Sequence, residues 1–257
     1  MNFCGYITDV SNKNLIQRRF IMKKTFFTAA ILAAATAFAA DGSTSSPTVS
    51  PNPTTDKGWT HFVGAGVTVP VSKYNVEGSD FSLVSAGLNL SYMGISKSGF
   101  AVRADLSSGA TFTDDVKYNE KEDADVGTYV AGEVGLGYGF VNTPDWTVAV
   151  FATVGVEGSV FTRDTETYKH PDLGKVDWTR SVTLGALTLG GDLVVRKALG
   201  NHVGVFASVG GRWAPVAVWL LTDEYDNDDV NRKDTFKSDK SDGGFTVVPT
   251  VGAMWNF

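Results

Sequence analysis

The sequence has little of several features on which common protein classes depend. One cysteine, Cys4, is present among 257 residues, which excludes an internal disulfide, a thiolate zinc site and a Cys-x-x-Cys redox pair. Charged residues make up 19% of the chain, below the ~25% of a typical soluble domain. The formal net charge is −6, and phosphate binding needs a basic surface, so no nucleic-acid partner is expected.

Long hydrophobic runs are also missing. The longest apolar stretch, residues 25–38, is shorter than the ~20 residues that a membrane-spanning helix needs. What the chain does contain is 28 glycines, 12% aromatic residues and 43% hydrophobic residues. This composition argues against a disordered chain.

The apolar stretch lies within a predicted signal peptide, residues 22–39. Two lysines after Met22 precede the apolar run, which ends in Ala-Phe-Ala at residues 37–39, a small-x-small cleavage site. Residues 1–21 are interpreted as an upstream extension from a start assigned too early; a long n-region is the alternative. Residues 40–58 are rich in Ser, Thr and Pro and predict a flexible periplasmic leader. The chain is therefore expected to be exported.

From Trp59 onward, apolar residues recur with a period of two, which is the pattern of β-strands. Residues 146–160 show it well: the even positions are mostly valine, and several odd positions are Thr, Gly, Glu or Ser. Eight such segments are predicted, at roughly 59–73, 81–95, 99–112, 128–141, 145–161, 178–197, 202–221 and 244–257.

The connections between these segments alternate in length. Three are short (96–98, 142–144 and 198–201), and three are long and charged (113–127, 162–177 and 222–243). Short turns at one end and long loops at the other are typical of an outer-membrane β-barrel. Hydrocarbon offers no hydrogen-bond partner to a free strand edge, so the first and last strands must pair. The predicted fold is all-β, a closed eight-stranded antiparallel up-and-down transmembrane β-barrel over residues 59–257.

Aromatic residues lie near both ends of the predicted strands, as expected of rings that prefer the headgroup region. On the turn side they are Trp59, Phe100, Phe140, Trp146, Trp255 and Phe257. On the loop side they are Tyr74, Phe81, Phe112, Tyr129, Phe161, Trp178, Trp219 and Phe245.

In the last predicted strand, Val251, Trp255 and Phe257 share one face, and an aromatic residue stands last. Here the chain resembles small bacterial outer-membrane barrels of the OmpA/OmpX-like eight-stranded type. The resemblance implies that these three residues are a signal for the barrel-assembly machinery. It also implies location in the outer membrane of a Gram-negative-type bacterium, among outer-membrane lipids and lipopolysaccharide.

Predicted strands six and seven are irregular. Val182 and Leu184 alternate out of phase with Leu187 and Leu189, which predicts a bulge near 185–186. Pro215 lacks an amide donor, so a register change is expected there. Both strands exceed the ~9–11 residues that cross a membrane, so they are expected to project above the outer surface.

Seven charged residues fall on the inward face of the predicted barrel: Arg103, Asp105, Glu133, Glu157, Asp192, Arg196 and Arg212. An eight-stranded barrel has an interior just wide enough for side chains to fill it. The favoured interpretation is a lumen packed with ion pairs that offset one another's desolvation. The alternative is a narrow ion or small-solute pore controlled by those pairs.

The last long connection contains five carboxylates within seven residues: Asp223, Glu224, Asp226, Asp228 and Asp229. Carboxylates at this density could bind Ca²⁺ or Mg²⁺, although the glycine and terminal glutamate of an EF-hand are missing. A solvated acidic loop is the favoured interpretation. Bridging of lipopolysaccharide phosphates by divalent cations is the intermediate hypothesis.

No catalytic pattern is present. The three histidines, His61, His170 and His202, lack the serine partners of a strand-borne hydrolase, and no GxSxG, phosphate loop or HExxH occurs. No enzyme activity and no cofactor are predicted. The predicted function is a structural or surface-interaction role through acidic outer loops, with the pore as the alternative and a lipid-modifying enzyme third.

Overall fold

The computed structural model describes residues 58–76, 79–113, 117–118, 121–122, 126–162, 166–170, 174–226, 231–238 and 243–257. The predicted signal peptide, the extension before it and nearly all of the leader lie outside the described residues, as do Asp228 and Asp229. No helix in the described part of the chain is long and apolar enough to cross a membrane. The regular elements there are all strands.

Eight strand segments build the main sheet, and their bounds follow the predicted ones closely. They are β1 and β2 (Trp59–Thr68 and Val71–Val76, counted together), β3 (Ser79–Ser96), β4 (Phe100–Thr113), β7 (Val126–Asn142), β8 (Trp146–Thr162), β10 (Gly174–Ala198), β11 (Val203–Asp226) and β13 (Gly244–Asn256). Each pairs antiparallel with the next along the chain.

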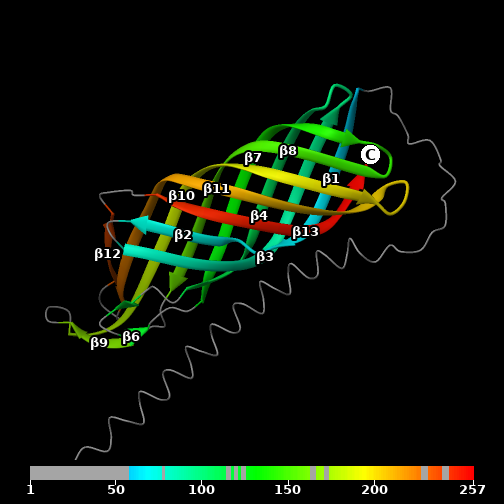
Figure 1. Ribbon diagram of the computed structural model, residues 1–257. Helices are drawn as coiled ribbons and strands as arrows, with labels where there is room; N and C mark the ends of the chain where they lie inside the picture. Colours follow the sequence, from blue (N-terminus) through cyan, green and yellow to red (C-terminus); the bar gives the residue numbers. More distant parts are fainter. Residues whose placement is uncertain are drawn as a thin grey trace, which may run out of the picture. The chain divides into compact units, whose positions relative to one another are not determined.

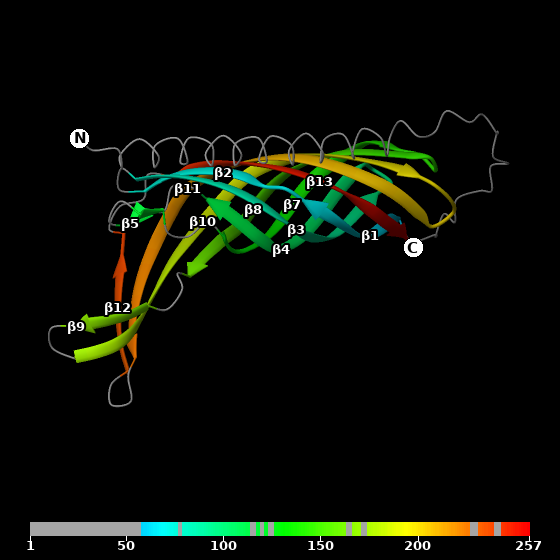
Figure 2. The ribbon, with the colours of Figure 1, turned by 90° about the horizontal axis from the view of Figure 1, so that it is seen from below.

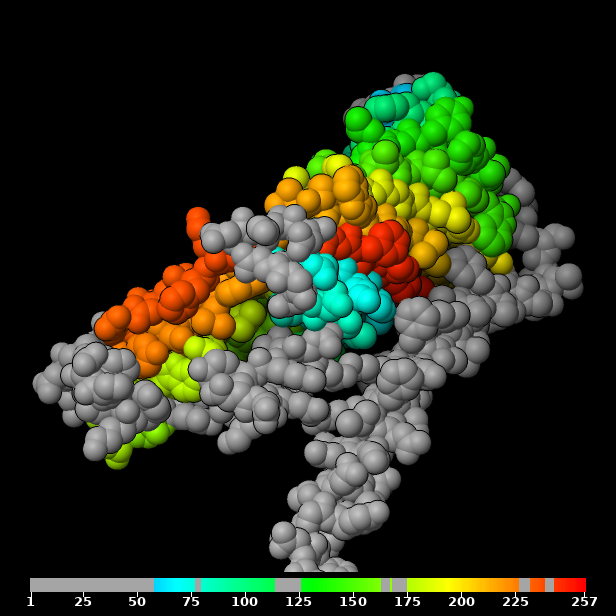
Figure 3. Space-filling model, turned by 60° about the vertical axis from the view of Figure 1, so that its left-hand side comes forward, coloured from blue at the N-terminus to red at the C-terminus, as the bar shows by residue number. Residues whose placement is uncertain are grey.

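The sheet closes on itself. β13 pairs antiparallel with β1 from Phe62↔Asn256 to Thr68↔Thr250, and β1 pairs with β3 on its other side. Figure 1 shows the tilted strands wrapping into a barrel, and in Figure 3 red β13 lies on the surface between cyan β2–β3 and orange β11. The predicted fold class is confirmed, because the pairings of the described strands return to the strand from which they start.

The first predicted strand, 59–73, is interrupted at Val69 and Pro70. β1 and β2 nevertheless keep one register against both β3 and β13. Pro70 has no amide to donate, although its carbonyl accepts a hydrogen bond from Ser85 N at 2.8 Å. Pro249 lies in the facing strand, where its carbonyl accepts from Val69 N at 3.1 Å. The interruption is therefore a local loss of backbone amide donors at the prolines, and β1 and β2 are two parts of one strand.

The bulge predicted near 185–186 is wrong. β10 pairs without interruption with β8 from Ser181 to Lys197, so its phase is constant. The register of β10 against β11 shifts between Leu187 and Leu189, where β11 has an additional residue at Ala214-Pro215. The register change expected at Pro215 is thus confirmed. Leu184 broke the predicted phase because it is an apolar residue that points inward, where it is 4% exposed.

Strands β10 and β11 continue past the barrel wall and recruit two short strands, β9 (Glu166–His170) and β12 (Asn231–Lys237). β9 pairs with the start of β10, and β12 with the end of β11, which gives a projecting sheet in the order β9-β10-β11-β12. Figure 2 shows this extension bending away from the barrel end. In the first long connection, β5 (Lys117–Tyr118) and β6 (Lys121–Glu122) form a separate small hairpin.

Candidate functional site

The barrel interior consists of layers of different polarity, and the inward-pointing residues of a single strand show their order. Because side chains alternate across a strand, every second residue of β8 points inward. The first of them at the turn end is Thr147; then come Ala149 and Phe151, which are apolar, then Thr153, Gly155 and Glu157, and then Ser159 and Phe161. The inward face therefore passes from an apolar to a polar and back to an apolar layer.

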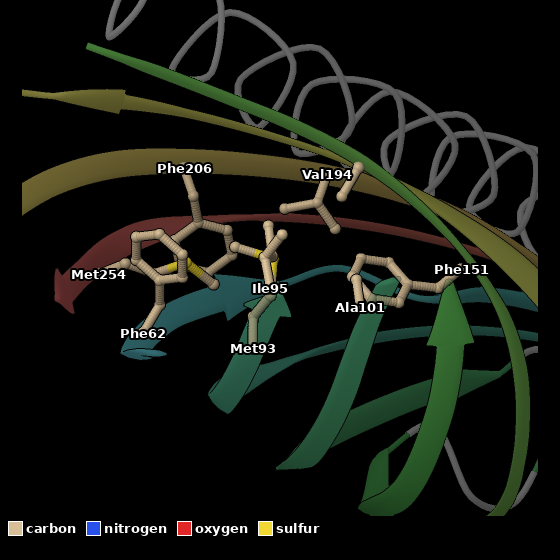
Figure 4. Packing of buried hydrophobic residues seen from close by; sticks show 9 residues of the cluster. Phe62, Met93, Ile95, Ala101, Phe151, Val194, Phe206 and Met254 are labelled. Carbon is tan, nitrogen blue, oxygen red and sulfur yellow. The ribbon is translucent and has the colours of Figure 1, made fainter. Parts of the chain in front are cut away.

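The layer nearest the short turns is a cluster of buried apolar residues from several strands. It contains Phe62, Met93, Ile95, Ala101, Ala149, Phe151, Val194, Phe206 and Met254. Figure 4 shows these side chains converging inside the barrel. Glycine makes room for one of the rings, since a Cβ on Gly252 would lie 2.7 Å from Phe206 Cε1. This cluster fills the turn end of the lumen together with Arg196 and Asn256, which are also buried there.

The middle layer is charged. Arg103 of β4 pairs with Asp105 on its own strand, Nε to Oδ2 at 2.5 Å, and reaches Asp192 of β10, Nη1 to Oδ2 at 3.5 Å. Arg212 of β11 donates two hydrogen bonds of 2.6 Å to the carboxylate of Glu133 on β7. Asp192 also accepts from Arg212 Nη2 at 3.0 Å. Asp192 therefore joins the two arginine pairs into one network.

A glycine allows this network to form. A Cβ on Gly210 would lie 2.0 Å from Asp192 Oδ1 and 2.2 Å from Arg212 Nη1. Any side chain at this position would displace the ion pair between Asp192 and Arg212. Nothing in the sequence pattern marks Gly210 among the 28 glycines of the chain.

The other two predicted lumen charges stand apart from the network. Arg196 lies near the turn end, with its guanidinium 4.8 Å from the centre of the Phe62 ring, and donates to Asn256 Oδ1 at 3.0 Å. Glu157 accepts hydrogen bonds at Oε1 from the Tyr74 hydroxyl and from Thr246 Oγ1. Five of the seven predicted residues are brought together, and these two are not.

The layer nearest the loops is again apolar. It contains Tyr74, Val76, Phe81, Leu83, Phe161, Leu184, Ala214 and Ala217. This cluster corrects the predicted loop-side aromatic belt, because Tyr74, Phe81, Tyr129 and Phe161 are buried inside the barrel. The residues before and after each of these aromatic residues in the strand point outward. In these apolar stretches, only tertiary contacts show whether the aromatic side chain lies on the inner or the outer face. Exposed aromatic residues toward this end include Phe112, Trp213, Phe236 and Phe245.

The described part of the barrel interior has cavities beside its charged residues. One of about 30 Å³ lies within the charged layer and is lined by Asn89, Asp105, Glu133, Glu157, Asp192 and Arg212, among others. One of about 10 Å³ lies beside Tyr74 and Glu157. A cavity needs at least ~10–15 Å³ to hold one water, so the larger cavity has room for about two.

The predicted carboxylate loop is only partly described. Asp223 is 4% exposed and accepts hydrogen bonds from Arg180 at 2.6 and 2.5 Å and from Trp178 Nε1 at 3.2 Å. Glu224 pairs with Lys233 at 3.2 Å, whereas Asp226 is exposed. Within the described ranges, no three or more His, Cys, Asp or Glu residues lie together as metal ligands would. Two of the three described carboxylates thus already have basic partners.

The residues predicted as an assembly signal lie on the outside of the barrel. Trp255 and Phe257 are more than half exposed, and Val251 is half-buried. His61 stacks on Trp59 and Phe257 and contacts the Tyr92 hydroxyl at 2.8 Å, and His202 stacks on Trp255. Both histidines are therefore part of the aromatic rim at the turn end.

The outer wall has the opposite chemistry from the charged layer inside it. Large apolar side chains project outward from every barrel strand, among them Val63, Leu88, Leu106, Leu136, Val156, Leu189, Val209 and Trp255, and Leu88 is 71% exposed. A soluble protein rarely exposes a continuous apolar surface of this extent. The chain folds as a transmembrane-type β-barrel.

No protein-family model matches the sequence, and no curated protein matches it. Among solved structures, the barrel is similar to a major outer membrane protein from Thermus thermophilus, with a TM-score of 0.47 and 14% identity over 75% of this chain and 99% of that one. It is also similar to the outer membrane protein OprG from Pseudomonas aeruginosa, with a TM-score of 0.47 and 14% identity over 78% and 96% of the chains.

A third similar structure is Ail, the attachment invasion locus protein of Yersinia pestis, with a TM-score of 0.43 and 12% identity over 77% of this chain and 98% of that one.

Proposed function

We propose that this protein is an outer-membrane anchor whose barrel is closed to solutes and whose projecting β-sheet meets partners outside the cell. The role is structural or surface-interacting and involves no catalysis. The observation that supports it most directly is the layered lumen, in which a charged network is enclosed between two apolar clusters. An ion that crossed the barrel would have to pass both hydrocarbon layers without water, at a high desolvation cost.

The extension beyond the barrel supports the second half of the proposal. β10 and β11 are 25 and 24 residues long, well over the ~9–11 residues that cross a membrane. An internal contact stiffens the extension, because Arg180 of β10 holds Asp223 of β11 by two hydrogen bonds and stacks 5.0 Å from the Trp178 ring. A flexible loop would not present a fixed surface, whereas this four-stranded sheet does.

Planar-bilayer recording separates the anchor from the pore. We expect the refolded chain to give no discrete current steps, because the lumen is filled at both ends. Folding is checked beforehand by the mobility difference between heated and unheated samples. Reproducible single-channel steps from a correctly folded sample would contradict the closed lumen and favour the charged layer as a narrow pore.

A charge on the outer wall tests whether that wall faces lipid. Val134, on the outside of β7, is 58% exposed. We expect Val134→Arg to destabilise the barrel folded in lipid vesicles by about 2–4 kcal/mol, as for a basic residue near the midplane of a membrane barrel. The measurement is urea titration in vesicles.

Thr128→Arg is the matched control for the lipid-facing wall. Thr128 lies on the same strand and the same outward face but near the loop end. Its cost is expected at about 0–1 kcal/mol, as at an interface. Equal, small costs for both variants would mean that the apolar wall does not face hydrocarbon.

A further inference from the structure

One half-buried carboxylate in the barrel, that of Glu157, has no cationic partner. Glu133, Asp105 and Asp192 each pair with an arginine. Glu157 instead accepts from two hydroxyl groups at Oε1. Among the described residues, no lysine or arginine lies within ion-pair distance of Glu157. Because it lies between the charged layer and the loop-end cluster, its negative charge is shielded poorly by bulk water.

The interior as a whole carries one negative charge too many. It contains three guanidinium groups, on Arg103, Arg196 and Arg212, and four carboxylates, on Asp105, Glu133, Glu157 and Asp192. An uncompensated charge in a low-dielectric interior costs several kcal/mol, so a barrel of this kind needs one additional positive charge. A single monovalent cation would bring the sum to zero.

The cavity of about 30 Å³ lies where that charge is needed. Glu157 lines it together with Asn89, which is 3% exposed. Asn89 Nδ2 donates to Asp105 Oδ1 at 3.3 Å and to Ser107 Oγ at 3.1 Å, whereas the buried carbonyl oxygen Oδ1 accepts no hydrogen bond. A buried carbonyl oxygen that accepts no hydrogen bond lowers the stability of the folded protein unless a cation or a hydrogen-bond donor contacts it.

We propose that this cavity binds one small monovalent cation, of the size of Na⁺, through the carboxylate of Glu157 and the carbonyl oxygen of Asn89. Oxygen atoms of these two kinds are the ligands that hard cations take. The charge of the ion follows from the sum over the whole interior, where three guanidinium groups face four carboxylates. The volume allows the ion and about one water. The inference is independent of what the projecting sheet binds.

Ion-specific stabilisation of the whole refolded chain tests the site. Urea unfolding is followed at pH 8 in increasing NaCl, with N-methylglucamine chloride keeping the ionic strength constant. At a Na⁺ concentration ten times the dissociation constant, we expect the unfolding equilibrium constant to fall roughly 11-fold. Line broadening of the ²³Na resonance by the folded barrel, but not by the unfolded chain, is expected in parallel.

Matched variants assign the effect to the cavity. Glu157→Gln keeps the shape and can still bond to the hydroxyl groups, but it removes the charge, so the dependence on Na⁺ should disappear. Glu224→Gln removes a carboxylate of the projecting sheet, and the dependence should stay. If Glu157→Gln does not refold, Asn89→Ala serves instead and should weaken Na⁺ binding.

Three results would overturn the proposal. Equal stabilisation by both salts would mean that no specific cation is bound. A dependence on Na⁺ that persists in Glu157→Gln, or in Asn89→Ala where that variant is used, would place the ion elsewhere. Stabilisation on lowering the pH to 5, with no effect of Na⁺ at pH 8, would mean that a proton neutralises the interior.

Discussion

Replacing Arg212 with methionine is expected to destabilise the barrel by about 3–5 kcal/mol, the cost of removing one partner from a buried ion pair. Arg212 is 4% exposed and binds Glu133 and Asp192, whose side chains are 15% and 2% exposed and which lose this partner in the variant. Methionine has nearly the length of the arginine stem, so lost packing adds little. Urea unfolding of the refolded protein, followed by tryptophan fluorescence, measures the effect.

Arg232→Met is the control for Arg212→Met. Arg232 pairs with Asp234 at 3.1 Å, but its side chain is 51% exposed, so its loss is expected to cost about 0–1 kcal/mol. Adding Glu133→Gln and Asp192→Asn to Arg212→Met removes the stranded charges and should recover most of the stability. If Arg212→Met cost no more than Arg232→Met, the charged layer would not depend on its arginine.

The second large effect is expected at the turn end of the lumen. Phe206 is 1% exposed and packs among Phe62, Met254 and the other residues of the apolar cluster. Phe206→Ala should destabilise the barrel by about 3–5 kcal/mol, because the truncated side chain leaves a cavity that the stiff wall cannot close. The same unfolding experiment measures the cost.

Phe236→Ala is the control for Phe206→Ala. Phe236, on β12, is 56% exposed, and its replacement should cost far less than that of Phe206. In planar bilayers, Phe206→Ala alone should stay silent, because the loop-end cluster and the charged layer still fill the lumen. A variant as stable as the wild type would show that the turn-end cluster contributes little to holding the barrel together.

The sequence was sufficient to predict the barrel. Apolar residues that recur at every second position predict a strand whatever the strands beside it are. The alternation of short and long connections predicts that neighbouring strands are antiparallel. The same alternation predicted that all seven charges share the inward face, since a residue such as Glu133 has the opposite phase from the valines beside it.

Local pattern failed where both faces of a strand can be apolar. Phe161 and Val160 are neighbours of similar hydrophobicity, yet the structure buries Phe161 to 1% exposure and leaves Val160 41% exposed. The same ambiguity led to a bulge being predicted in β10, although the additional residue lies in β11 at Ala214-Pro215. Polar residues give the phase of a strand, and stretches without them leave it open.

By itself, then, the sequence determined the strands, their order and the side on which each charge lies. Only the tertiary structure decided which charges meet, because Asp192 reaches both Arg103 and Arg212 through the stagger of three strands around a closed ring. It also decided that Arg196 and Glu157 stand apart and that apolar layers enclose the network. Register and stagger are properties of the whole ring, so no single strand contains them.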